Sequence, residues 1–462
     1  MTRVIDQIAE FAVSTSFGDL PTGAASMVVD AITDAYGVGV AGSQEDAAKA
    51  VLRVIATSPG SSPIPLLGTD LTSSELDASL YHGTAIHALD YDDTAHPAYA
   101  HPSAHLVPVL LSLSLSGEVS GQTLITAYLL GFEVENKLGR SLNMDHYLHG
   151  WHATGTFGTL ASAVTAAKIL RLDAPTTRSA VAIAASLAGG IRANFGTMTK
   201  PLHAGLAARN GVFAARLATT GFTASDNAFD GRFGFLDVFG GEHRDLDCWS
   251  TLGHEWEISD PHGLAIKPYP SCGATHPAIE AALLARADLG DERIDTVRVG
   301  TNTFTSDILI YDAPAEPLEG KFSMQYCVAS ALTNGWVDLR TFTIASISDP
   351  STRELMKRVT LYVDDDVREN SEFGAVITVT TAGGRQIRRI VPLAKGKPER
   401  WMDESDRRSK FVDCAAPTTG PIRAVATFRA LQELASRDDA SYLAHLWQDS
   451  RSFVPQGAGS TS

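Results

Sequence analysis

Cysteine is scarce in this sequence. The 462 residues include only four, Cys248, Cys272, Cys327 and Cys414, and no two of them have a CxxC spacing. Zinc sites and iron–sulfur clusters need several closely placed thiolates, so neither has a signature here. We therefore expect no metal and no cofactor, and any loss of water from a substrate would have to rely on side chains alone.

Positive charge is also in short supply, since 37 Lys and Arg stand against 53 Asp and Glu, for a formal net charge of −16. Nucleic acid is therefore not an expected partner, because binding to phosphates requires clustered basic residues and no such run is present. An acidic protein can still bind an acidic small molecule if a few positive groups gather in one shielded pocket. Those few groups are what the sequence must supply.

Long hydrophobic runs are missing as well. The most apolar stretches, such as residues 180–191, fall short of the roughly 20 residues that a membrane span needs. The amino terminus carries Asp6 and Glu10 in an amphipathic pattern, without the basic region and apolar core of a secretory signal. These features predict a soluble, cytoplasmic protein with no membrane partner.

The spacing of apolar residues divides the chain into two kinds of segment. Between about residues 5 and 240 they recur every three and four positions, and Ala-rich stretches, including 158–172 and 179–193, predict closely packed helices. Beyond about residue 263 the pattern changes to β-branched alternation, with one helix among the strands. The expected strands are 296–304, 358–363, 375–381 and 386–392, and the expected helix is 322–334.

This length exceeds what one hydrophobic core usually organises, so we expect two domains. The predicted fold is mainly α with an α+β second domain. A large, discontinuous all-helical domain, residues 1–262 and 403–462, is interrupted by a smaller α/β domain, residues 263–402. The polar tail, residues 455–462, is expected to be disordered. A cleft between two such domains is a favoured ligand site.

Reactive side chains are densest in residues 87–105, where three acids and four histidines fall within 19 positions. Prolines follow His96 and His101 and disfavour helix there, which predicts a loop that presents side chains. A carboxylate such as Asp90 that accepts from one imidazole nitrogen raises the basicity of the other, and so makes a general base. The alternatives are histidines that only cap helices, or a magnesium site formed by the aspartates.

A second segment, residues 146–158, has three histidines at intervals of three, ending at His152. The spacing hints at a metal site, but Gly150 interrupts the helix that would align them. Threonines and glycines lead from His152 into an Ala-rich helix, whose free amide groups attract anions. We therefore favour a role in acid–base chemistry or anion binding over a metal site.

Two more segments carry candidate groups. Lys200 precedes Pro201, which suits the first position of a helix, so its ammonium is expected near a positive helix end where it can bind a carboxylate. A solvated surface lysine is the alternative. The segment from Lys267 to His276 falls where the domains should meet. Within it Cys272 could be a nucleophile, although cysteines are more often merely buried, and His276 is the stronger candidate.

Together these segments resemble the MmgE/PrpD family. The resemblance covers nearly the whole chain, and it also includes residues 28–43 and 321–329, the Gly396-Lys-Pro run, and Lys410-Phe411. It implies a helical domain and a smaller lid domain, usually in a homodimer, with the active site between the domains and no required cofactor. The family includes 2-methylcitrate dehydratase, cis-aconitate decarboxylase and iminodisuccinate epimerase, which implies a small polycarboxylic acid as substrate.

The resemblance also assigns residues. The catalytic groups of the family's decarboxylases fall on four residues that are all matched here, Asp90, His101, His152 and Lys200. Two further positions depart from that pattern, because Cys272 replaces an expected histidine and Phe304 an expected tyrosine. The dehydratase pattern is imperfect too, since the loop ends in Ala-His-Pro-Ser-Ala-His instead of a Gly-His-Pro-Ser-Asp-Asn-like run.

As a hypothesis, Lys200, with Lys267 or Arg192, binds substrate carboxylates. One of His101 and His152 removes a proton next to a carboxylate, and the other donates a proton to the leaving hydroxyl or to the carbanion. The other expected substrate-binding residues are His96, Cys272 and His276. Dehydration ranks first, and decarboxylation or epimerisation through the same type of carbanion are alternatives. A non-catalytic polycarboxylate-binding protein is the alternative of a different class.

Overall fold

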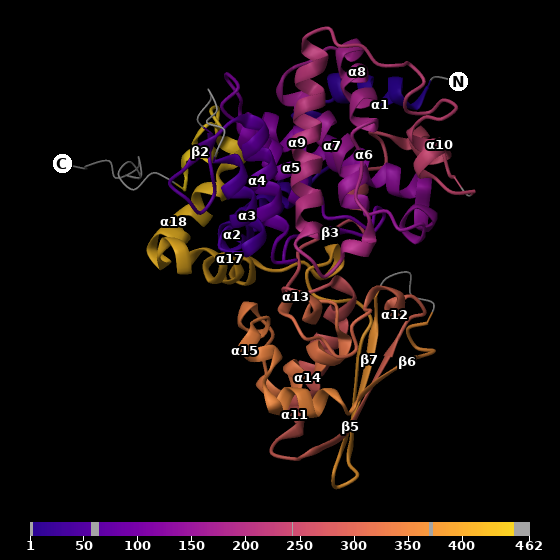
Figure 1. Cartoon of the computed structure of the whole chain (residues 1–462), viewed down its shortest axis with the longest axis vertical. Helices are drawn as coiled ribbons and strands as arrows, with labels where there is room; N and C mark the ends of the chain where they lie inside the picture. Colours follow the sequence, from indigo (N-terminus) through magenta and orange to yellow (C-terminus); the bar gives the residue numbers. More distant parts are fainter. Residues whose placement is uncertain (1–2, 57–63, 243, 369–372, 448–462) are drawn as a thin grey trace, which may run out of the picture.

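The computed structural model describes residues 3–56, 64–242, 244–368 and 373–447, and it shows two bodies that meet at a waist (Figure 1). The larger body is helical, and the smaller one combines a sheet with helices. This confirms the predicted fold class, a mainly α protein with an α+β second domain. The tail for which the sequence predicts disorder lies outside the described residues.

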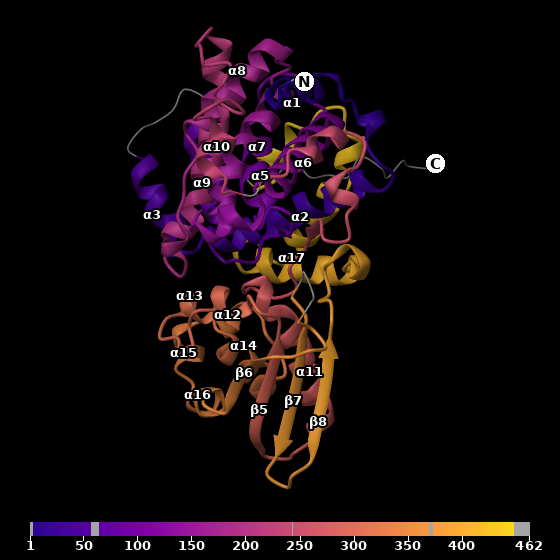
Figure 2. The ribbon, with the colours of Figure 1, turned by 90° about the vertical axis from the view of Figure 1, so that its right-hand side faces the viewer.

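The larger body, called the helical domain below, contains the amino-terminal helices and the last three helices of the chain. Its helices are α1 Val4–Ser14, α2 Ala24–Gly42, α3 Asp46–Ile55, α4 Glu75–His87, α5 Pro102–Leu113, α6 Gly121–Leu148, α7 Ala153–Ile169, α8 Ala174–Ala185, α9 Thr199–Thr219, α10 Phe235–Phe239, α17 Glu404–Thr419, α18 Pro421–Gln432 and α19 Tyr442–His445. Figure 2 shows α17 on the side of this body that faces the smaller one.

Small residues let the central helices approach closely, as the Ala- and Gly-rich sequence predicts. A Cβ atom on Gly83 of α4 would lie 2.7 Å from Cα of Gly205 on α9, and one on Gly211 would lie 2.3 Å from Cβ of Ser162 on α7. Larger side chains at these positions would force the helices apart. Helices α4, α7 and α9 therefore form a tight centre, and the catalytic candidates lie at its lower end.

The predicted helix over residues 179–193 is too long. Helix α8 ends at Ala185, and the chain then turns through Gly190, whose φ of +126° lies outside the range of an L-residue in a helix. The turn lets the Gly190 carbonyl accept a hydrogen bond from the backbone N–H of His152 at 3.0 Å. The break therefore helps to fix a site residue.

Helix α2 has the length and apolar composition of a membrane span, and it is the one helix in the described part of the chain that does. The expectation that every apolar stretch is too short is therefore wrong for α2. Most of this helix is buried, however, and two carboxylates on it pair with cations of α17, Asp30 with Arg407 and Asp34 with Lys410. These contacts hold α17 against α2 as part of a protein core.

The smaller body, called the α/β domain below, has a four-stranded sheet in the order β6-β5-β7-β8, in which β5 and β6 are parallel and the other pairs antiparallel. Helix α11 packs against β7 and β8, and α14 packs against α11 and α16. The elements are α11 His276–Leu289, β5 Ile294–Thr301, α12 Thr305–Ile308, α13 Pro317–Gly320, α14 Met324–Asn334, α15 Ile344–Ile347, α16 Pro350–Met356, β6 Val359–Val363, β7 Ala375–Thr381 and β8 Gln386–Val391.

All four strands and the helix predicted for this domain are confirmed within a few residues. A hairpin turn joins β7 to β8, with Gly384 at φ +85° and the Thr381 N–H donating to the Arg385 carbonyl at 2.8 Å. Two further pairs of strands are very short: β1 Ile64–Pro65 with β2 Thr72–Ser73, and β3 Thr94–Ala95 with β4 Leu264–Ala265. The second pair holds the histidine-rich loop beside the chain that leads into the α/β domain.

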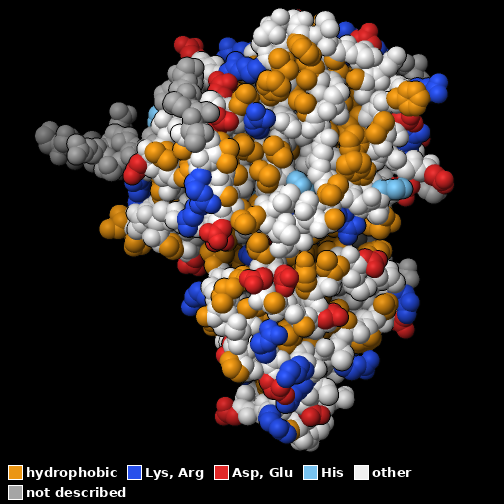
Figure 3. Space-filling model, viewed as in Figure 1, with side chains coloured by type: hydrophobic (Ala, Val, Ile, Leu, Met, Phe, Trp, Pro, Cys, Tyr) orange, Lys and Arg blue, Asp and Glu red, His pale blue; other side chains and the backbone are white. Residues whose placement is uncertain are grey.

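On the face drawn in Figure 3, Lys and Arg side chains lie singly among Asp and Glu side chains. The lower tip of the α/β domain carries charges of both signs. The lysines that matter for the site are buried at the waist instead.

Candidate active site

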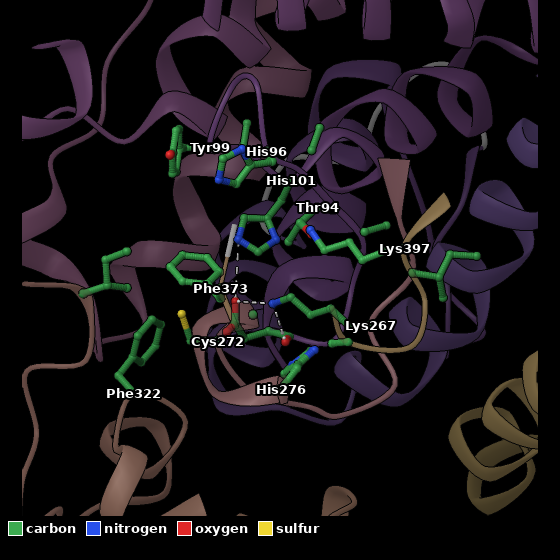
Figure 4. A pocket seen from close by; sticks show the side chains of 18 of the residues that line it. Thr94, His96, Tyr99, His101, Lys267, Cys272, His276, Phe322, Phe373 and Lys397 are labelled. Carbon is green, nitrogen blue, oxygen red and sulfur yellow. Dashed lines mark hydrogen bonds and ion pairs between the residues drawn. The ribbon is translucent and has the colours of Figure 1, made fainter. Parts of the chain in front are cut away.

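A pocket lies at the waist and is lined by both domains (Figure 4). The helical domain contributes the histidine-rich loop and the starts of α7 and α9, and the α/β domain contributes the start of α11 and the segment after β8. Of the nine site residues that the sequence predicts, eight line this pocket: Asp90, His96, His101, His152, Lys200, Lys267, Cys272 and His276. Arg192 does not.

The loop between α4 and α5 presents Asp90 in an unusual backbone conformation. Its φ is +50°, in the left-handed region that few non-glycine residues adopt. Lys321 from the α/β domain stabilises this turn, because its buried ammonium donates to the Leu89 carbonyl at 2.5 Å and to the Pro270 carbonyl at 3.0 Å. Burial lowers the pKa of Lys321 to about 8. The turn that carries Asp90 is thus tied directly to the second domain.

Asp90 accepts from two lysines. Its Oδ1 lies 2.6 Å from Nζ of Lys200 and 3.2 Å from Nζ of Lys267, which also donates to the Asp90 carbonyl at 2.9 Å. Burial alone would raise the pKa of Asp90, but the two lysines and the neighbouring imidazoles hold it well below its ordinary value. The carboxylate is therefore ionised, and the two ammonium groups leave one positive charge in excess.

Helix α9 begins at Thr199, two residues before the position that the sequence suggests, so Lys200 lies inside its first turn. A cation is disfavoured at the positive end of a helix. The ion pair with Asp90 offsets that cost, and the rings of Phe195 and Phe322 lie 5.2 and 4.9 Å from the ammonium. Lys200 is thus held in place at the pocket wall.

His101 immediately precedes α5, as expected for a residue before proline. Its Nδ1 lies 2.9 Å from the Asp93 carbonyl oxygen, which can only accept, so Nδ1 carries the proton and Nε2 has the free lone pair. Nε2 is 3.8 Å from Oδ1 of Asp90. Burial lowers the pKa of His101 to about 3, against the opposing effect of Asp92. His101 is therefore a neutral imidazole with its basic nitrogen beside the two lysines.

The three aspartates of the loop have separate roles. Asp92 accepts from Nδ1 of His87 at 2.9 Å and lies 3.2 Å from Nδ1 of His101. Asp93 faces the start of α5, where Ser103 donates to it from the backbone at 3.0 Å and from its hydroxyl at 2.5 Å, and burial raises the pKa of Asp93 to about 8. Because Asp93 points away, the three carboxylates do not act as one magnesium motif.

A different set of groups comes close enough to surround a metal ion. Ligand atoms of His87, Asp90, Asp92 and His101 lie within 4.8 Å of one another. The ammonium groups of Lys200 and Lys267 already occupy the positions next to Asp90, however, and a divalent cation would have to displace or approach them. The ammonium groups of the two lysines thus balance the negative charge of this cluster in place of a metal ion.

The histidines at intervals of three separate in space. His146 is in the core, with Nδ1 2.8 Å from the Phe239 carbonyl and Nε2 2.8 Å from the Thr156 hydroxyl, and His149 is exposed. Only His152 lines the pocket, immediately before α7, with its Nδ1 3.0 Å from Nδ1 of His203. Burial, together with Lys200, holds the pKa of His152 well below its ordinary value. The spacing does not form a metal site.

Family models match both parts of the chain. The MmgE/PrpD N-terminal domain matches residues 6–245, and the MmgE/PrpD C-terminal domain matches residues 269–433. The chain belongs to the MmgE/PrpD family. It is 30% identical to the cis-aconitate decarboxylase of Homo sapiens over 380 residues, which cover 80% of this chain and 78% of that protein. The cis-aconitate decarboxylase of Aspergillus terreus is 28% identical over 309 residues, covering 61% and 62% of the two chains.

The family match, together with relatives that are cis-aconitate decarboxylases, shows that this protein is an enzyme of the lyase type. The structure also shows the surroundings of Cys272, which stands where the decarboxylase pattern has a histidine, and of His276 nearby. Cys272 lines the pocket, and burial raises the pKa of its thiol, so it is not a ready nucleophile. His276 lines the pocket nearby, with Nε2 donating to the Ser271 carbonyl at 3.1 Å and its Nδ1 left as the acceptor.

His96 and Arg192 have different surroundings from the central groups. His96 lines the outer pocket wall beside the ring of Tyr99, and Figure 4 shows these two rings together. Arg192 stacks its guanidinium 3.7 Å from the ring centre of Tyr147 and donates to the Tyr147 carbonyl at 2.8 Å. It therefore supports a pocket-lining tyrosine from behind.

Several pocket residues of this MmgE/PrpD protein are not among the site residues that the sequence predicts. Among them are Thr94, Tyr99, Tyr147, Phe322, Phe373 and Lys397. His203 was missed as the partner of His152, although it lies only three residues after Lys200. Phe304, the residue at the expected tyrosine position, lines a separate hollow with His96 and Tyr99. The aromatic residues of the pocket wall are therefore not the one that the family resemblance places at Phe304.

Proposed function

We propose that this protein is a cofactor-independent carboxy-lyase that acts on cis-aconitate or a closely similar unsaturated tricarboxylate. The main support is the pairing of two lysines on one carboxylate, Asp90, directly beside the unprotonated Nε2 of His101. Such a site combines anion binding with proton transfer. Relatives that bear the name cis-aconitate decarboxylase, at 30% identity over four fifths of the chain, support the reaction.

In the proposed complex, Lys200 and Lys267 bind carboxylates that must stay on the substrate. Their charge-assisted contacts would also stabilise the negative charge that develops during the reaction. A carboxylate on the carbon next to the C=C leaves as CO₂ when its C–C bond breaks. The electron pair shifts the double bond, and the far alkene carbon, which is conjugated with another carboxylate, then takes a proton.

The proton must come from a group that carries one in the complex. In the free protein His101 is neutral, because burial and the nearby lysines outweigh Asp92 and lower its pKa to about 3. A bound polyanion adds negative charge beside the ring and so raises this pKa. We therefore propose that the imidazole takes up a proton as the substrate binds and delivers it to the carbanion.

Binding of tricarballylate, a saturated tricarboxylate that cannot react in this way, is expected to take up as much as about one proton per site at pH 7. Calorimetric titration in buffers of different ionisation enthalpy measures the proton uptake. The number of protons is the slope of the observed binding enthalpy plotted against the ionisation enthalpy of the buffer. The His101→Asn variant should bind with a much smaller slope. Equal slopes for both proteins would contradict the proposed role of His101.

Dehydration of a hydroxy-tricarboxylate, the reaction that the sequence ranks first, is the second candidate. It is favoured by Cys272, because a thiol with a raised pKa replaces the imidazole that the decarboxylase pattern expects at that position. His101 and His152 would still suffice for removing a proton and protonating a leaving hydroxyl.

The expected homodimer and cytoplasmic location also stay predictions.

A proton NMR time course in D₂O distinguishes these reactions. The protein is first treated with chelator and then incubated with cis-aconitate, 2-methylcitrate, citrate or iminodisuccinate. We expect loss of CO₂ from cis-aconitate, with one deuterium in the product. Loss of water from 2-methylcitrate alone would replace decarboxylation by dehydration, and deuterium exchange without net change would indicate an epimerase. No reaction with any of them would contradict the proposed substrates.

A further inference from the structure

Two more lysines, Lys395 and Lys397, line the pocket, and the proposed chemistry uses neither of them. Lys397 lies in the segment after β8 and lines the pocket, half-buried. In Figure 4 its side chain comes from the same side as Lys267, and its ammonium points inward toward Thr94. It reaches the part of the pocket on the far side of His101 from Cys272.

The backbone fixes Lys397 relative to the inner lysines. The Gly396 carbonyl accepts from the N–H of Ile266 at 3.0 Å, and the Gly396 N–H donates to the Arg400 carbonyl at 2.9 Å. Gly396 has φ +96°, and a Cβ atom there would lie 1.9 Å from the Ile266 carbonyl oxygen, so only glycine allows this approach. Lys397 therefore comes directly after Gly396, whose backbone contacts Ile266, the residue immediately before Lys267.

The charged groups around Asp90 do not balance the full charge of a tricarboxylate, so a further cation would be favourable. Lys200 and Lys267 share Asp90, and the buried ammonium of Lys321 offsets the ionised Asp92, which together leave one net positive charge. The imidazoles of His101 and His276 add none at neutral pH, since burial lowers the pKa of each to about 3. A tricarboxylate brings three negative charges, so the inner groups balance only part of them.

We propose that Lys397 binds a substrate carboxylate at the outer end of the pocket and makes the enzyme selective for three carboxylates over two. This inference rests on the proposed function, because it assumes that a polycarboxylate occupies the pocket. A charge-assisted hydrogen bond in a partly buried site contributes enough binding free energy to make the affinity for a tricarboxylate clearly higher than that for a dicarboxylate.

Lys395 supplies a matched control. It is two residues away and also lines the pocket. Its ammonium forms an ion pair with Asp406 of α17, and its backbone N–H donates to Glu280 at 3.1 Å. Removing this charge alters the electrostatic field near the pocket without removing an inward-pointing group. Any effect specific to Lys397 must exceed that of Lys395.

The test compares binding of tricarballylate with binding of glutarate, which lacks only the central carboxylate. We expect Lys397→Met to raise the Kd for tricarballylate by about 10- to 100-fold, a loss typical of a hydrogen bond to a charged group. The Kd for glutarate should change by less than about threefold, and Lys397→Arg should restore most of the tricarballylate affinity. Lys395→Met should shift both constants by less than about threefold.

The outcomes separate the inference from the proposed function, since calorimetry needs no turnover. Equal losses for the two ligands, or unchanged tricarballylate binding by Lys397→Met, would overturn the role of Lys397 while leaving the polycarboxylate pocket in place. Failure of the unmodified protein to bind tricarballylate would overturn both. Thermal unfolding of each variant checks that the fold is kept.

Discussion

Replacement of His101 by Asn is expected to lower kcat by about 10²- to 10⁴-fold, the usual contribution of a positioned acid–base group. The asparagine amide can still donate to the Asp93 carbonyl, as Nδ1 does now, so the start of α5 should keep its structure. What is lost is Nε2, the nitrogen that lies beside Asp90 and the lysines. Steady-state kinetics with cis-aconitate measures the effect.

His149→Asn is the control for this experiment. His149 belongs to the second histidine-rich segment, residues 146–158, but it is exposed and its Nδ1 lies 2.6 Å from the Asp145 carbonyl, away from the pocket. We expect its kcat to match that of the unmodified protein. A His101→Asn variant with a kcat within about threefold of the unmodified enzyme would show that another group transfers the proton.

Replacement of Asp90 by Asn is expected to destabilise the fold by about 3–5 kcal/mol, the cost of leaving a buried charge without its partner. Two ammonium groups, Lys200 and Lys267, would then face each other with no carboxylate between them. Urea unfolding followed by circular dichroism measures the loss. A bound tricarboxylate should restore part of the stability, because its negative charge replaces that of Asp90.

The double variant Asp90→Asn/Lys200→Met tests the cause. It removes one positive charge along with the negative one, so it should be more stable than Asp90→Asn alone, although neither variant should be active. If the single and double variants unfold at the same urea concentration, the excess positive charge is not what destabilises the protein.

Much of this arrangement could be predicted from the sequence, because it depends on local rules. The change from helical to β-branched patterning located the α/β domain, and the prolines after His96 and His101 predicted a loop. The density of acids and histidines in that loop marked the site. These signals lie in consecutive residues, so no knowledge of the fold was needed.

The other features of the site depend on packing between segments that are distant in the sequence. His203 meets His152 because α9 crosses α7, and Tyr147 reaches the pocket from the end of α6. Lys397 is placed by contact with Ile266, more than a hundred residues earlier. The break of α8 before Gly190 was missed because its alanines favour helix, whereas the position of His152 requires a turn.

The long separations within the site also bear on how the protein is made. Asp90 leaves the ribosome well before its partners, since Lys200 follows 110 residues later and Lys267 177 residues later, and Lys321 comes 232 residues after Leu89. A nascent chain that contains only the first helices has a histidine-rich loop without the cations that order it. The active site is therefore assembled late in synthesis, when the α/β domain docks, and the amino-terminal helices must wait for that event in an incomplete state.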